Sequence, residues 1–99
     1  MRILSLPTLR AFYETPGYSD AKGPLLTWHT HTLKAHWLEP ADVKADFGNA
    51  SFLKNGQAVF NIAGNKYRLV ASINYPYGIV FVKFIGTHKQ YDAIDAQTI

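Results

Sequence analysis

Apolar residues recur at helical spacing through the first half of the chain. The spacing of residues 6–13 predicts a helix, which Ser5 is expected to cap because its hydroxyl can accept from free N–H groups of the first turn. A second helix is predicted to begin after Asp20 and to run through Trp37, up to the next proline. The stretch 40–46 is expected to add one or two short helical turns.

The pattern changes in the second half, where β-branched and aromatic residues alternate with polar ones. Residues 57–62, 66–74 and 79–85 are predicted to be strands. The segments between them, residues 63–65 and 75–78, contain the glycine, asparagine and proline that suit tight turns. The three strands are therefore expected to form an antiparallel meander.

Two short elements complete the prediction. Residues 1–4 are expected to form a strand, and Thr87 is positioned to cap a short helix that runs through Tyr91 and Ile94. The order of strand, two helices, three-stranded meander and terminal helix indicates an α+β fold, with the helices segregated from the sheet. The length of 99 residues predicts a single domain over residues 1–99.

The composition favours a folded protein of the cytoplasm. Hydrophobic residues make up 47% of the chain, which supports a core and argues against disorder. The absence of cysteine excludes disulfides and thiolate metal sites and fits a reducing compartment. No apolar run approaches the roughly 20 residues of a membrane helix, so no membrane partner is expected.

Positive charge is concentrated in one part of the chain. Residues 1–46 balance their charges, whereas residues 47–91 contain no Asp or Glu. The cations of this segment are Lys54, Lys66, Arg68, Lys83 and Lys89. Such a segment attracts polyanions, and phosphate contacts dominate the affinity for nucleic acids. The alternative is a solvated basic face without a ligand.

Strand alternation places Arg68 on one face of the meander. Asn61 and Lys83 belong to the neighbouring predicted strands, and a suitable register would align all three on the face away from the helices. That arrangement would be a polar patch on an otherwise apolar sheet. The alternative is that these are ordinary solvent-facing positions of a half-exposed sheet.

His88 is the strongest candidate for acid–base chemistry. It stands three residues before Tyr91, on the same face of the predicted terminal helix, and histidine transfers protons near neutral pH. A purely structural His–Tyr pair is the alternative. His29, His31 and His36 have spacings that do not suit a shared metal ion, so partly packed or surface histidines are expected there.

Two motifs resemble the HigB-type toxin family: FNIxGNKYRLV at residues 60–70 and GTHxxYD at residues 86–92. Residues 5–10 and 37–44 are also similar. The resemblance implies a RelE-like α+β fold with two N-terminal helices packed on a small antiparallel sheet and a short C-terminal helix. It further implies an mRNA interferase, an endoribonuclease that cuts mRNA on the ribosome. A helix-turn-helix antitoxin of the HigA type would hold it inactive, and no metal or organic cofactor would be needed.

The residues identified above suit such chemistry. Cleavage of RNA without a metal needs a base for the 2′-OH, cations for the charged phosphorane and an acid for the leaving 5′-oxygen. His88 is expected to be the base or the acid, with Tyr91 as its positioning partner or the second proton-transfer group. Arg68 and Lys83 are expected to hold the scissile phosphate. The expected RNA-binding residues are Lys66, Lys89, Asn61 and Asn65.

Two other classes of function remain open at this point. A basic α+β module could dock on RNA or on the ribosome without cutting. An interaction protein could instead use exposed aromatic residues such as Tyr75 and Tyr77 to dock a protein partner. Binding that weakens steeply with ionic strength would favour the RNA readings over the second class.

Overall fold

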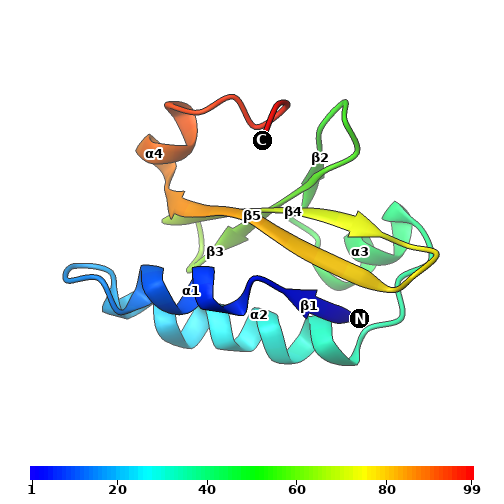
Figure 1. Cartoon of the computed structure of the whole chain (residues 1–99), viewed down its shortest axis with the longest axis horizontal. Helices are drawn as coiled ribbons and strands as arrows, with labels where there is room; N and C mark the ends of the chain where they lie inside the picture. The colour runs from blue at the N-terminus through cyan, green and yellow to red at the C-terminus, as the bar shows by residue number, and fades with distance from the viewer.

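A five-stranded sheet, in the order β1-β5-β4-β3-β2, divides the molecule into two layers. The computed structural model describes residues 1–99, and Figure 1 shows α1 and α2 on one side of the sheet and α4 with the C-terminal segment on the other. The strands are β1 (Arg2–Leu4), β2 (Ser51–Phe52), β3 (Ala58–Ile62), β4 (Tyr67–Asn74) and β5 (Ile79–Thr87). The helices are α1 (Leu6–Tyr13), the 3₁₀ turn η1 (Ser19–Ala21), α2 (Lys22–Lys34), α3 (Pro40–Asp46) and α4 (His88–Asp92).

The predicted α+β fold and the β3-β4-β5 antiparallel meander are confirmed. The strand expected at residues 1–4 is confirmed as β1 at one edge, and the structure adds the unpredicted β2 at the other. β1 pairs in parallel with β5, so that Arg2 lies opposite Ile79, and β2 pairs with Ala58 and Val59 of β3. β2 has only two residues, too few for an alternating pattern to reveal it in the sequence.

The predicted helices are confirmed in position, but two of them end early: α4 ends at Asp92 instead of running through Ile94. α2 ends at Lys34 instead of running through Trp37, because the backbone of Ala35 is extended. The Trp37 side chain is nevertheless buried, and its Nε1 donates to the Asp46 Oδ2 at 2.9 Å. The expected capping of α1 by Ser5 is wrong: this residue adopts a left-handed conformation and its side chain makes no cap hydrogen bond.

The main core fills the space between the helices and the inner face of the sheet, which is the face toward α1 and α2. Its aromatic centre is Phe60, whose ring lies 5.4 Å from Trp28, 6.2 Å from Trp37 and 5.3 Å from Phe47, measured between centroids. Each fully buried aromatic or aliphatic side chain contributes about 1.5–3 kcal/mol. None of the helices has the length and hydropathy that crossing a bilayer requires.

The outer face of the sheet, opposite α1 and α2, carries a smaller apolar cluster. Its fully buried members are Val59, Val70 and Ala96, and Phe84, Tyr91 and Ile94 pack against them. Polar side chains hold the C-terminal segment in place: the Asn55 Nδ2 donates to the Gln97 carbonyl at 2.8 Å, and the Gln57 Nε2 to the Ile99 carbonyl at 2.9 Å. The segment therefore covers part of the outer face and leaves the rest to solvent.

Candidate functional site

Arg68 lies on the outer face, because its neighbours Tyr67 and Leu69 point into the main core. Its guanidinium folds back onto the β3–β4 turn. Nη2 donates to the Asn65 Oδ1 at 2.8 Å, and Nη1 to the carbonyls of Asn65 at 3.2 Å and Tyr67 at 3.3 Å. These bonds fix the group while its Nε–H has no partner within the protein. A guanidinium held in this way is prepared to receive a phosphate oxygen.

The strand register confirms only part of the predicted polar patch. Asn61 lies directly opposite Arg68, and Gly86 flanks Arg68 on the other side. Lys83 is not in this row: Val70 pairs with Phe84 and Ala71 with Val82, so a β-bulge leaves Lys83 unpaired. Lys83 is exposed and lies roughly 10 Å along β5 from Gly86.

Gly86 allows α4 to pack closely on the outer face. A Cβ atom at this position would lie 2.6 Å from the Phe84 Cζ and 2.7 Å from the Gln90 Oε1. The predicted cap is confirmed, since Thr87 and Gln90 form a reciprocal capping box with distances of 3.1 and 2.8 Å. The first turn of α4 is thereby fixed on the same face of the sheet as Arg68.

His88 opens α4, and its ring is held by a carboxylate. The His88 Nδ1 lies 3.1 Å from the Asp92 Oδ2, four residues further along the helix. This contact favours a proton on Nδ1 and leaves Nε2, which has no protein partner, as the nitrogen that can accept one. Tyr91, the partner expected from the sequence, instead packs its ring against Phe84 at 6.4 Å. Asp92 is the residue missed, and its i+4 spacing from His88 was the available signal.

Lys66, at the β3–β4 turn, forms an ion pair with Asp20. The same carboxylate accepts a hydrogen bond from the Tyr67 hydroxyl. The Lys66 and Tyr67 hydrogen bonds lower the pKa of Asp20, and the Asp20 hydrogen bond raises the pKa of Lys66. Because Lys66 and Asp20 are both largely exposed, a phosphate can compete for the ammonium at little cost. Lys89 is exposed and has no ion pair.

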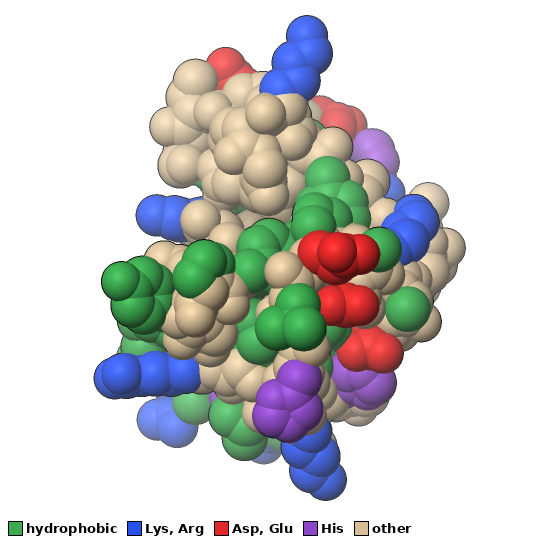
Figure 2. All heavy atoms as spheres, turned by 90° about the vertical axis from the view of Figure 1, so that its right-hand side faces the viewer, with side chains coloured by type: hydrophobic (Ala, Val, Ile, Leu, Met, Phe, Trp, Pro, Cys, Tyr) green, Lys and Arg blue, Asp and Glu red, His purple; other side chains and the backbone are tan.

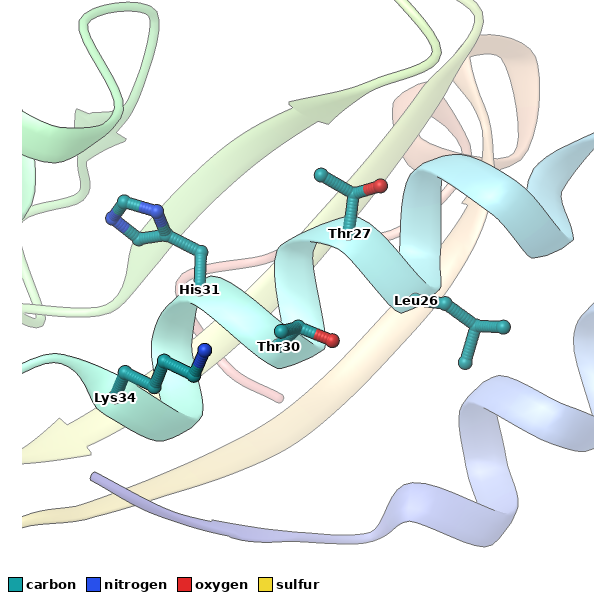
Figure 3. A pocket seen from close by; sticks show the side chains of 5 residues that line it. All are labelled: Leu26, Thr27, Thr30, His31 and Lys34. Atoms are coloured by element: carbon teal, nitrogen blue, oxygen red, sulfur yellow. The ribbon is translucent and has the colours of Figure 1, made fainter.

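Two depressions mark the surface. The larger, about 470 Å³, lies on α2 alone, and Figure 3 shows its side chains spreading from one helix without converging on a common point. Its lining residues are Leu26, Thr27, Thr30, His31 and Lys34. The smaller, about 230 Å³, lies beside β3 and includes Asn61. No group of three or more His, Asp or Glu side chains is arranged to hold a metal ion.

Acidic residues occur in several parts of the molecule: Asp92 lies on α4, Asp20 pairs with Lys66, and a further group lies on and just before α3. α3 and the residue before it carry Glu39, Asp42 and Asp46, three of the seven Asp and Glu residues of the chain. In Figure 2, which views the end that includes α3, acidic side chains gather beside apolar ones while Lys and Arg side chains extend from the rim.

Most of the chain is similar in sequence to proteins that are already known. The sequence model of the HigB toxin family, described as the RelE-like toxic component of a toxin–antitoxin system, matches residues 21–94. Relatives from two strains of Escherichia coli, named mRNA interferase toxin HigB and mRNA interferase HigB, are 28% identical over 81 residues. The mRNA interferase HigB of Shigella flexneri is equally similar, and each match covers 80% of this chain and 78% of the relative.

The matched region carries every element of the candidate site. It includes the meander with Asn61 and Arg68, and it extends through α4 with His88 and Asp92. The α+β architecture described above is consistent with a RelE-like fold. The chain therefore belongs to the HigB toxin family, the RelE-like toxic components of toxin–antitoxin systems.

Proposed function

We propose that this toxin is an mRNA interferase, an endoribonuclease whose active surface is the outer face where β4, β5 and the first turn of α4 meet. The observation that carries the proposal is the position of a fixed guanidinium, Arg68, on the face of the sheet against which α4 packs, and α4 carries the carboxylate-held imidazole of His88. Cleavage of RNA without a metal requires a cation to stabilise the charged phosphorane and a side chain that can transfer protons.

His88 acts first as the general base in this mechanism. Its Nε2 takes the proton of the 2′-OH, and the 2′-oxygen attacks the adjacent phosphorus. Asp92 keeps the ring oriented and offsets the charge of the imidazolium that forms. The bond from phosphorus to the 5′-oxygen then breaks, which leaves a 2′,3′-cyclic phosphate on one product. Tyr91, whose hydroxyl has no hydrogen-bond partner in the protein, supplies the proton to the 5′-oxygen.

Arg68 stabilises the doubly charged phosphorane through its free N–H donors. A preorganised donor of this kind contributes a factor of about 10²–10³ to the rate. Asn61 lies opposite Arg68 across the strands, and the Asn65 side chain accepts from its guanidinium. Lys66 in the adjoining turn and Lys89 in α4 supply further positive charge. All four are proposed to bind the flanking nucleotides. Lys83, displaced by the bulge, binds a neighbouring phosphate instead of the scissile one.

The substrate is mRNA, and the relatives are named for action on the same molecule. In the proposed setting the chain works as a single domain on ribosome-bound mRNA in the cytoplasm. A helix-turn-helix antitoxin of the HigA type restrains it. The reaction requires no metal, since the acid, the base and the cation are all side chains.

Primer extension on mRNA after brief induction tests the proposal. We expect wild type to produce discrete cuts. His88→Gln should reduce cleavage by about 10²–10⁴-fold and Arg68→Ala by about 10²–10³-fold, with both variants folded by circular dichroism. Lys54→Ala is the control: it removes a cation from the β2–β3 turn, away from Arg68, and should keep nearly full activity.

Two outcomes would overturn the proposal. Full activity of folded His88→Gln would remove the assigned proton-transfer group. Wild-type protein that binds RNA but leaves mRNA intact would identify a basic RNA- or ribosome-binding module without catalysis.

A further inference from the structure

The smaller depression lies beside the proposed active surface, and apart from Asn61 its lining plays no part in the mechanism above. It is formed by the loop after α3 and by the open edge of β3, and it includes Asn61. Asn61 is the direct cross-strand partner of Arg68, and neighbouring strands lie only about 5 Å apart. A group bound in this depression would therefore belong to the same ligand that Arg68 holds.

The depression exists because β2 is so short. β2 pairs only with Ala58 and Val59, so the edge of β3 from Phe60 onward has no neighbouring strand. The chain between α3 and β2 bends away and forms the opposite wall. In most sheets such an edge is covered or paired; here it opens onto a hollow of about 230 Å³.

Hydrogen bonds and ring contacts make the opposite wall rigid. The Ala50 N–H donates to the Phe47 carbonyl at 2.9 Å, and the Lys44 Nζ donates to the Ala50 carbonyl at 2.6 Å. The Phe47 ring packs against Phe60 at 5.3 Å and Trp37 at 6.0 Å between centroids. The hollow is therefore preformed, as small-molecule sites usually are.

The lining offers hydrogen bonds that the protein leaves unused. The side chains of Asn49 and Asn61 make no hydrogen bond within the protein. The Asp46 Oδ2 accepts from the Trp37 Nε1 and lies 3.2 Å from the His31 Nε2, whereas Oδ1 has no partner. The Trp37 hydrogen bond lowers the pKa of Asp46, so this carboxylate remains an acceptor at neutral pH.

These features define the ligand by its chemistry. The unused Asp46 Oδ1 is an acceptor, so it favours a group that donates a hydrogen bond. The half-buried Phe47 side chain lines the hollow, and the Asn49 and Asn61 carboxamides match the donor and acceptor pattern of a base edge. The volume lies below the roughly 300–1,000 Å³ of pockets for drug-sized ligands, which fits one base rather than a larger group.

We propose that this hollow binds one nucleobase that carries an exocyclic amine, from the RNA whose phosphate lies at Arg68. The inference rests on the proposed function for its ligand. Adenine, guanine and cytosine each offer an amine to Asp46, whereas uracil offers none. The pocket would thereby set a base preference at one fixed position beside the cut, with Asn49 and Asn61 reading the rest of the base edge.

Cleavage of short RNAs that differ at one position tests the preference. We expect wild type to cut substrates with an amino-bearing base at the selected position about tenfold faster, in kcat/KM, than the same substrates with uracil. Asn49→Ala should reduce that ratio toward one. Thr27→Ala, in the larger depression on α2, is the matched control and should keep both the rate and the ratio.

A binding experiment separates this inference from the proposed catalysis. Adenosine and uridine monophosphates are titrated into the inactive His88→Gln variant, with the amide signals of residues 46–50 followed by NMR. Selective shifts of these signals by adenosine monophosphate support the pocket even if wild type cuts no RNA. Unchanged signals with both nucleotides, or an unaltered base ratio in Asn49→Ala, would overturn the pocket while leaving the cleavage mechanism intact.

Discussion

Substitution of Gly86 by alanine probes the close packing that fixes α4 beside Arg68. The new methyl group would meet the Phe84 ring at 2.6 Å and the Gln90 side chain at 2.7 Å. Displacing a packed ring costs about 1–3 kcal/mol. The Gln90 Oε1 also accepts the Thr87 N–H at 2.8 Å, and losing that capping box costs about 1 kcal/mol more. The free energy of unfolding should therefore fall by about 2–4 kcal/mol.

Urea unfolding followed by tryptophan fluorescence measures this loss. With a slope of about 2 kcal/mol per molar, in the middle of the range for a small domain, the midpoint should fall by roughly 1–2 M. Gly23→Ala is the matched control, because no atom lies within 4 Å of its new Cβ and α2 gains a better helix former. That variant should be more stable by up to about 1 kcal/mol.

Cleavage of RNA should fall in Gly86→Ala even at urea-free, fully folded conditions, since the first turn of α4 carries His88. A Gly86→Ala protein that unfolds at or above the wild-type midpoint would refute the reasoning, because the close approach of α4 would then have no energetic consequence.

Three further predictions concern the rest of the fold. Thr32→Val should raise the free energy of unfolding by about 1–2 kcal/mol in thermal melts, because the buried Thr32 hydroxyl has no partner; destabilisation would contradict this. Asp20 has a lowered pKa, so its stabilisation is present above about pH 4 and is lost as the pH falls through its folded value. Asp20→Asn should therefore flatten the loss of stability below about pH 4 in urea midpoints. Phe60→Ala should cost about 3–5 kcal/mol by urea unfolding; a smaller cost than 1 kcal/mol would show that the aromatic centre is loosely packed.

Local patterns were sufficient to predict the meander and the short helices. Strand alternation placed Arg68 on the outer face correctly, because Tyr67 and Leu69 are unmistakable core residues. The hairpin residues 63–65 then fixed Asn61 opposite Arg68. In each case the information lies within a few residues of the feature, which is the range over which a sequence pattern can be interpreted.

Features that depend on distant segments were not predictable. The parallel pairing of β1 with β5 has no local signature, and the β-bulge that displaces Lys83 depends on contacts across strands. The end of α2 at Lys34 reflects packing of Trp37 in the core rather than helix propensity. The pairing of His88 with Asp92 is an exception, because the i+4 spacing is visible in the sequence once a helix is assumed.

The pairing of β1 with β5 also sets an order of events during synthesis. Residues 2–4 have no strand to join until residues 79–81 have been made, because β1 has no other neighbour in the sheet. Contacts between segments so far apart close late in folding. His88 and Asp92 follow within a few residues of β5, so the nascent polypeptide completes its scaffold and acquires its proposed cutting groups almost together. An incomplete translation product that stops before β5 therefore lacks both the partner strand of β1 and the proposed cutting groups.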